Sequence, residues 1–227
     1  MSEALIPDAA RAAAVSPARR VRLWAEFAAL FIGTPVLMVA FFGQYPLFPV
    51  LLGLAGLSAL LLAATPGFRF RELVEGPVLR EWRLILGFAV LVALACTAIA
   101  LILVPGRFLD LPLSRPGLWL AIMLAYPIAS VLPQELIFRP LFFRRYGTLF
   151  PNVGTAVAAN AVAFGLGHLF YLNPLTIAMT AVGGAVFAWA YMRHRSFLLA
   201  CVLHAVAGQI VFTAGLGIFF YHGAIMR

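Results

Sequence analysis

The stretch PQELIFR, residues Pro133–Arg139, lies inside an apolar run, 118–143, that is long enough to cross a bilayer. Of the eight acidic residues in the chain, Glu135 alone lies far from the end of such a run. A carboxylate at that depth costs at least ~2.5 kcal/mol to insert, and intramembrane ionisable groups commonly serve function. Arg139 follows four residues later, on the same face of a helix. The stretch predicts a membrane protein built around a buried Glu–Arg pair.

The composition of the chain also indicates a membrane protein. Of its 227 residues, 64% are hydrophobic and 11% are charged, which would leave a soluble domain with a vast exposed apolar surface. The net charge of +8 comes from arginines that cluster at the ends of apolar runs. Membrane topology explains this placement better than nucleic-acid binding does, so no nucleic-acid partner is predicted. Cys96 and Cys201 lie inside apolar runs and suggest neither a disulfide framework nor a cysteine metal site.

Seven apolar runs, judged at about 20 residues per crossing, follow a polar N-terminal segment. Residues 1–22 carry no early apolar core with a cleavage site, which favours a cytoplasmic tail over a signal peptide. Residues 23–227 are predicted to form a single transmembrane domain. The expected spans are 23–42, 47–64, 84–104, 118–143, 153–170, 175–192 and 197–221. The predicted fold class is therefore all-α, a polytopic transmembrane helical bundle of about seven helices.

The arginines outside the spans predict the orientation of this bundle. With the N-terminus inside, all of them except Arg107, Arg115 and Arg227 fall on the cytoplasmic side, as the positive-inside rule requires. We therefore expect an integral membrane protein, in the plasma (inner) membrane, with a cytoplasmic N-terminus. The segment 66–83 mixes Arg and Glu with apolar residues and is expected to lie along the membrane surface.

Polar residues within the later spans form the candidate site. They are Gln134, Glu135, Arg139, Asn160, His168, His204 and Gln209. Counted from the flanking arginines at ~1.5 Å per residue, Glu135 and His204 both lie about 13 Å deep, near the midplane. His168 comes out about 24 Å deep, a mismatch that closes only if its helix is tilted or begins in the interface. Glu135 and His204 are therefore expected to be in contact. His168 is expected to lie beside them if its helix is tilted or begins in the interface.

A glutamate and two histidines around a hydrated cavity have a clear chemical use. Glu135 can act as a general base on a water molecule, while His168 and His204 position that water or a carbonyl oxygen. The plainer interpretation is a Glu135–Arg139 salt bridge with two histidines that hydrogen-bond neighbouring helices. Because four ionisable groups lie on three helices, a catalytic site is favoured, with Arg139 anchoring Glu135. Two His and one Glu could also hold a divalent metal such as zinc, which is the minor option.

Three short motifs follow one another in the second half of the chain. They are QELIFR at Gln134–Arg139, FGLGH at Phe164–His168 and HAVAG at His204–Gly208. Their order resembles the CPBP intramembrane protease family, which includes the type II CAAX prenyl endopeptidases and bacteriocin-processing relatives and carries Glu-Glu-x-x-x-Arg, Phe-x-x-x-His and His-x-x-x-Asn. The resemblance covers about residues 117–215. It implies an endopeptidase core that acts on membrane-associated peptides or proteins, by a glutamate-dependent mechanism without a firmly held metal.

Two positions depart from the family pattern. Gln134 stands where the family has its catalytic base, and an amide cannot take a proton from water at neutral pH. Glu135 is rotated about 100° from it on a helix and faces the site only if the neighbouring prolines distort that helix. Gly208 replaces an asparagine that helps to hold an oxyanion, and Gln209 or Asn160 are the candidates to substitute for it.

Three functions are therefore compatible with the sequence. The first and favoured one is a protease variant with Glu135 as the base and Gln134 as a hydrogen-bond donor. The second is a catalytically inactive membrane scaffold or binding protein that retains the fold. The third is a small proton-coupled transporter in which Glu135 and the histidines relay protons. The motifs select neither a prenylated substrate nor an oligomeric state.

Overall fold

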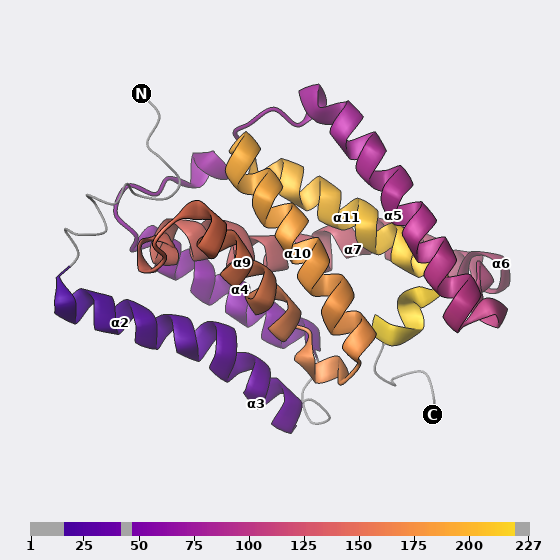
Figure 1. Ribbon diagram of the computed structural model, residues 1–227, viewed down its shortest axis with the longest axis horizontal. Helices are drawn as coiled ribbons and strands as arrows, with labels where there is room; N and C mark the ends of the chain where they lie inside the picture. Colours follow the sequence, from indigo (N-terminus) through magenta and orange to yellow (C-terminus); the bar gives the residue numbers. More distant parts are fainter. Residues whose placement is uncertain (1–15, 42–46, 221–227) are drawn as a thin grey trace.

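The computed structural model describes residues 16–41 and 47–220, and all regular structure in these two ranges is helical (Figure 1). By length and composition, five of the described helices can cross a membrane, and two shorter apolar helices accompany them. The five are Pro17–Phe41, Leu79–Leu103, Pro116–Arg145, Val153–Tyr171 and Pro174–His194, and the shorter two are Leu47–Ala63 and Phe197–Thr213. Together they match the expected spans one for one, which confirms the predicted all-α transmembrane bundle.

The α-helical segments are joined in places by π-helical turns. In chain order the segments are α2 (Pro17–Ala28), α3 (Thr34–Phe41), α4 (Leu47–Ala63), α5 (Trp82–Leu103), α6 (Asp110–Ser114), α7 (Pro116–Tyr126), α8 (Leu132–Leu136), α9 (Val153–Leu166), α10 (Pro174–His194) and α11 (Phe197–Thr213). The long helix Pro116–Arg145 contains two π-helical stretches, Pro127–Val131 and Ile137–Arg145. Proline lacks a backbone N–H and clashes with the preceding turn, so Pro127 and Pro140 account for these distortions.

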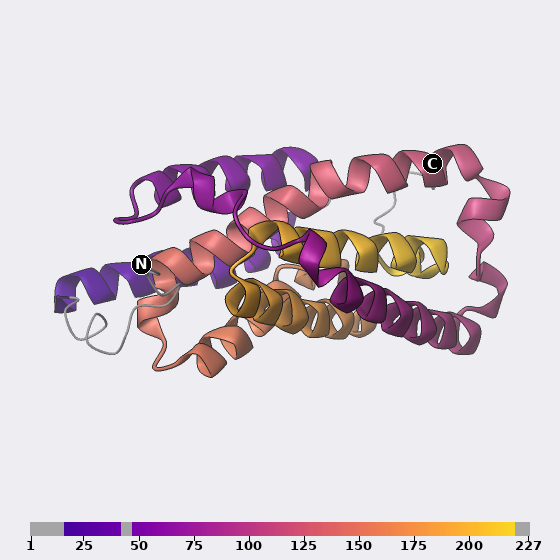
Figure 2. The same cartoon turned by 90° about the horizontal axis from the view of Figure 1, so that it is seen from above.

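The helices that carry the three motifs pack against one another. The long helix Pro116–Arg145 runs along the length of the molecule, beside α11 (Figure 2). On its other sides, α11 contacts α5 and α10, and α10 in turn packs along α9. The motif on α8 therefore lies close to those on α9 and α11, although up to 69 residues of chain separate the side chains that touch.

Small residues allow α9 and α10 to approach closely. A Cβ atom at Gly184 of α10 would lie 2.8 Å from the Cβ of Phe164 on α9, and one at Gly165 would lie 3.1 Å from the Cβ of Ala181. Contacts of this kind bring helix backbones together and provide much of the packing energy in membranes. They also fix Phe164, whose ring contacts both site histidines.

Replacing Gly184 by alanine is expected to lower the free energy of unfolding by about 1–3 kcal/mol, because the added methyl group overlaps Phe164. Gly53 on α4 is the matched control, since a Cβ there meets nothing within 4 Å. Gly53→Ala should be neutral or stabilising by up to about 1 kcal/mol through helix propensity alone. Unfolding of the two variants in detergent micelles measures both effects. Equal effects at the two glycines would contradict the close α9–α10 contact.

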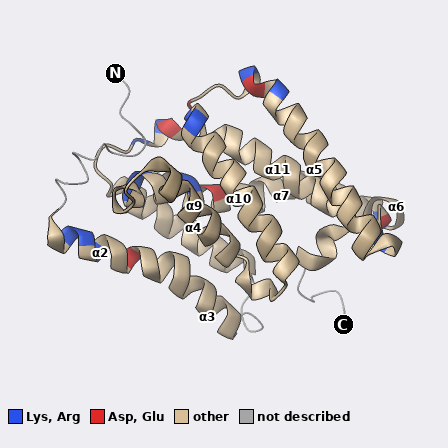
Figure 3. Ribbon diagram, in the orientation of Figure 1, with Lys and Arg blue, Asp and Glu red and all other residues tan. Residues whose placement is uncertain are grey.

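Apart from the buried pair Glu135 and Arg139, most charged residues lie at or near the helix ends (Figure 3). Arg145 joins three elements there: it pairs with Glu26 of α2 at 2.7 Å and donates to the carbonyl oxygen of Leu61 on α4 at 3.2 Å. Tyr146 donates to the same Glu26 carboxylate, and burial raises the pKa of its phenol to about 12. The expected surface segment 66–83 contains two short 3-10 turns, Phe70–Leu73 and Leu79–Glu81.

Candidate active site

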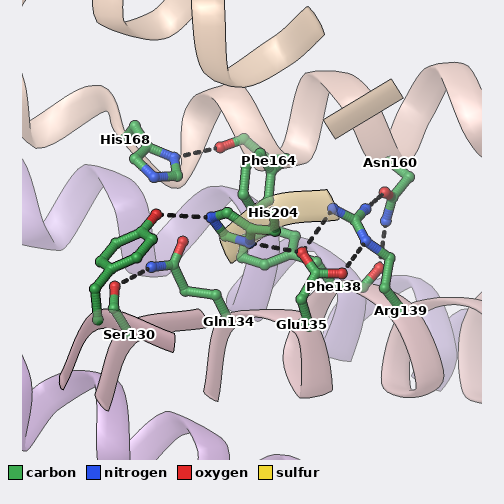
Figure 4. Close-up of polar contacts among 10 residues, drawn as sticks. Ser130, Gln134, Glu135, Phe138, Arg139, Asn160, Phe164, His168 and His204 are labelled. Atoms are coloured by element: carbon green, nitrogen blue, oxygen red, sulfur yellow. Dashed lines mark hydrogen bonds and ion pairs between the residues drawn. The ribbon is translucent and has the colours of Figure 1, made fainter. Parts of the chain in front are cut away.

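Glu135 and Arg139 form a two-point ion pair in the interior of the bundle. Both side chains are 0% exposed. Arg139 Nε donates to Glu135 Oε2 at 2.8 Å, and Arg139 Nη2 donates to Glu135 Oε1 at 3.2 Å (Figure 4). Each charge has been removed from water, so each depends on the other for compensation. The spacing of four residues places the two groups on one helix face, as the sequence suggested.

Asn160 is a further hydrogen-bond partner of Arg139 in this pair. Arg139 Nη1 donates to Asn160 Oδ1, and Asn160 Nδ2 donates to the carbonyl oxygen of Phe138 at 2.6 Å. The Arg139 guanidinium also lies over the Phe164 ring, 5.1 Å from its centroid. Asn160 is therefore occupied in fixing Arg139 and lies on the side of it away from His168 (Figure 4).

His204 links the ion pair to a tyrosine. Its Nδ1 lies 2.9 Å from Glu135 Oε1, and its Nε2 lies 3.1 Å from the hydroxyl oxygen of Tyr126. A carboxylate can only accept a hydrogen bond, so the ring proton is on Nδ1 and Nε2 accepts from the Tyr126 O–H. A neutral ring also leaves the group of Glu135, Arg139 and His204 without net charge, which the apolar interior favours. Phe187 stacks on the imidazole at 4.9 Å between centroids.

A cavity of about 2,210 Å³ adjoins this cluster. Residues of all the α-helical segments from α3 to α11 line it, mainly with apolar side chains. Its polar wall includes Tyr126, Ser130, Gln134, His168 and His204. Glu135 and Arg139 do not line the cavity and are fully buried behind His204. A molecule in the cavity can therefore contact both histidines directly but can reach Glu135 only through His204.

Gln134 and Glu135 point in different directions although they are neighbours (Figure 4). Gln134 lines the cavity, where its Nε2 donates to Ser130 Oγ at 2.8 Å. The segment between the two π-helical stretches, Leu132–Leu136, is α-helical, so the angle of about 100° between successive side chains is retained. The expected proline distortion lies on either side of the pair and does not turn Glu135 into the cavity.

His168 follows α9 directly and lines the cavity. Its Nδ1 lies 2.8 Å from the carbonyl oxygen of Phe164, which therefore accepts the ring proton and leaves Nε2 as an acceptor. The Phe164 ring lies 4.9 Å from the His168 ring and 5.4 Å from the His204 ring, measured between centroids. The two imidazoles thus flank a single phenyl ring, and the depth mismatch expected from helix rise does not separate them.

Gln209 does not lie with these groups. Its Nε2 donates to the carbonyl oxygen of Met123 at 2.9 Å, and it lines a smaller pocket of about 410 Å³ between α5 and α11. Neither Gln209 nor Asn160 therefore occupies the place expected for a substitute at Gly208. That place holds Tyr126, which is not among the residues expected from the sequence. The four-residue spacing of Tyr126, Ser130 and Gln134 was the available signal, because it places them along one helix face.

The residues present do not fit the zinc site considered from the sequence. In the described part of the chain, no three His, Cys, Asp or Glu side chains gather as metal ligands. Arg139 and His204 occupy the oxygens of Glu135, and the nitrogen of His204 that faces the cavity contacts Tyr126. Glu135, His168 and His204 therefore do not offer three free donors to one point.

The fold and the buried polar cluster define an integral membrane protein of the helical-bundle class with a polar site inside the membrane. Residues 116–220 match the model of the family described as Type II CAAX prenyl endopeptidase Rce1-like. This stretch contains all three motifs, so the match confirms the resemblance drawn from them. No curated protein and no solved structure matches the chain.

Proposed function

We propose that this protein is an intramembrane endopeptidase that hydrolyses peptide bonds of membrane-associated substrates. The observation that carries the proposal is the 2.9 Å hydrogen bond between Glu135 and His204 at the wall of the cavity. The family match supports a peptidase-like fold. The arginine-rich helix ends support an N-terminus in the cytoplasm, and the proposed location is the plasma (inner) membrane.

In the proposed reaction, the Glu135–His204 pair activates water. A water molecule in the cavity replaces Tyr126 at His204 Nε2, which takes a proton as the water oxygen attacks the peptide carbonyl carbon. Glu135 stabilises the imidazolium that forms, as a carboxylate behind a catalytic histidine does. His204 then returns the proton to the leaving nitrogen, and the C–N bond breaks to give a carboxylic acid and an amine. Glu135 thus contributes to the base without touching the water itself.

His168 and Gln134 have positioning roles on the same wall. Nε2 of His168 accepts a hydrogen bond from the second proton of the attacking water, which fixes its orientation. The amide of Gln134 uses one N–H on Ser130 and has a second N–H to offer to a substrate carbonyl. Arg139 and Asn160 hold Glu135 from behind.

Replacing His168 by alanine is expected to make at least one membrane protein accumulate in its uncleaved form, by about tenfold or more, because the water loses its orientation. Mass spectrometry of membranes from cells with wild-type protein or His168→Ala measures this accumulation. His194→Ala is the matched control: His194 pairs with Glu81 at 3.0 Å, at a helix end, and does not line the cavity. Identical membrane proteomes for wild type and His168→Ala would contradict hydrolysis.

A second candidate function, peptide binding without hydrolysis, is favoured by one observation. Among the described residues that line the cavity, Asp110 is the only acid, and it pairs with Arg107 in the α6 region. The cavity-facing position 134, beside the histidines, carries an amide. A cavity with an amide instead of a carboxylate beside the histidines would bind a transmembrane segment without cleaving it.

Replacing Gln134 by glutamate separates the two functions. The new carboxylate would face the cavity and could take a proton from water directly, so cleavage of the accumulating partner should rise by about 10²-fold. Quantification of the cleaved and uncleaved partner by mass spectrometry measures the change. Gln134→Leu is the control of similar size and should not raise cleavage. If wild type cleaves nothing and Gln134→Glu does, the protein is a binding protein that retains a peptidase site.

A further inference from the structure

We propose that Tyr126 is a catalytic residue of this site, in the place that a side chain at position 208 would otherwise fill. The inference rests on the proposed peptidase function. Gly208 follows His204 by one helical turn on α11, so a side chain there would point to the same part of the cavity. A Cβ atom built at Gly208 would overlap Cε1, Cζ and the hydroxyl oxygen of Tyr126. Position 208 must therefore lack a side chain while Tyr126 is present.

The phenol of Tyr126 is held firmly in that position. Its hydroxyl lies 3.1 Å from His204 Nε2, and its ring meets the rings of His204 and Phe212 edge-on, at 6.0 and 5.6 Å between centroids. Tyr126 ends α7, and the π-helical turn Pro127–Val131 begins directly after it. The tyrosine therefore comes from a different helix than His204 but offers its O–H beside the same imidazole nitrogen.

A phenol O–H at this point can perform the task of an amide N–H. When a water molecule replaces the Tyr126 hydroxyl as the hydrogen-bond partner of His204 Nε2, the Tyr126 O–H can donate instead to the carbonyl oxygen under attack. The negative charge that develops on this oxygen strengthens the hydrogen bond in the transition state. Tyr126 keeps its proton throughout, because the proton of the water moves to His204 and then to the leaving nitrogen. The reaction therefore needs no additional proton donor.

The first experiment tests the Tyr126–His204 contact without relying on activity. Full-length protein with ¹⁵N-labelled histidine is placed in lipid nanodiscs, and the His204 Nε2 resonance is recorded. Tyr126→Phe should shift this resonance, because Nε2 loses its hydrogen-bond donor. Tyr191→Phe is the control: Tyr191 is a buried tyrosine that packs against Phe143 and does not line the cavity. An unchanged His204 resonance in Tyr126→Phe would overturn the proposal.

The second experiment exchanges the two positions. Gly208→Asn alone should lower the melting temperature in detergent by about 5 °C, because the new side chain overlaps the phenol. The double variant Tyr126→Ala/Gly208→Asn should regain this loss, since the space is vacated. Full additivity of the two single changes would contradict a shared space.

The third experiment measures cleavage of the partner that accumulates in His168→Ala membranes. Tyr126→Phe should lower kcat by about 10²-fold with little change in KM, as loss of one oxyanion donor does. The double variant Tyr126→Ala/Gly208→Asn should cleave at least tenfold faster than Tyr126→Ala, because the amide replaces the phenol. Unchanged kcat in Tyr126→Phe would limit Tyr126 to packing. If wild type cleaves nothing, the proposed function and the catalytic role fall together, while a shifted His204 resonance would still establish the contact.

Discussion

Replacing Arg139 by methionine should lower the free energy of unfolding by about 3–5 kcal/mol. Methionine has a similar length, so the loss arises mainly from charge and little from an empty volume. Without Arg139, the carboxylate of Glu135 remains fully buried with His204 as its one hydrogen-bond partner among the described contacts. The side-chain oxygen of Asn160, Oδ1, loses its hydrogen-bond donor as well. Reversible unfolding of purified protein in mixed micelles measures the effect.

Two control variants separate the charge effect from general damage. The double variant Glu135→Gln/Arg139→Met contains neither charge and should recover at least half of the loss, since a buried ion pair is often replaceable as a unit. Arg107→Met removes the partner of Asp110 in an exposed pair and should change stability by at most about 1 kcal/mol. A loss below about 1 kcal/mol for Arg139→Met would mean that Glu135 is protonated or hydrated, contrary to the buried ion pair.

Replacing His204 by alanine should lower the cleavage rate by about 10²–10⁴-fold, the usual contribution of a positioned acid–base group. His204 has this effect because it is the group that connects Glu135 to the cavity. The rate is measured with purified protein and the accumulating partner in lipid vesicles. The decrease should fall on kcat more than on KM, since apolar side chains provide most of the cavity wall.

Chemical rescue gives the His204 prediction a second test. The alanine variant leaves a space beside Phe187, and imidazole added to the vesicles could enter it from the cavity. Rescue by imidazole, with no rescue of His168→Ala under the same conditions, would assign the proton transfer to position 204. His194→Ala should retain full activity. Cleavage at the wild-type rate by His204→Ala would contradict the mechanism, provided that its melting temperature shows a folded protein.

The spans and the buried ion pair could be predicted from the sequence because both follow from local chemistry. A run of about 20 apolar residues must cross the membrane as a helix, whatever lies beside it. A lone carboxylate in such a run needs a partner, and Arg139 is the nearest on the same face. The contact between Glu135 and His204 was also expected from their equal depth, and the two side chains lie 2.9 Å apart.

The details of the site depend on packing between distant segments, and these could not be predicted. Gln209 was a candidate for the site, but its amide contacts the backbone of Met123 on α7. The importance of Tyr126 appears only when α11 brings Gly208 against it, and no local pattern in the sequence shows that approach. Whether Gln134 or Glu135 faces the cavity depends on how the long helix is rotated between two π-helical stretches. A sequence motif fixes the order of such residues but does not fix that rotation.

The most direct test of the mechanism is a solid-state NMR distance between ¹⁵N-labelled Nδ1 of His204 and the ¹³C-labelled carboxyl carbon of Glu135 in lipid bilayers. The structure places Nδ1 2.9 Å from Oε1 of Glu135, so the nitrogen-to-carbon distance should be about 4 Å or less. A separation beyond about 6 Å excludes a hydrogen bond between the two groups. That result would contradict a base formed by Glu135 and His204 together.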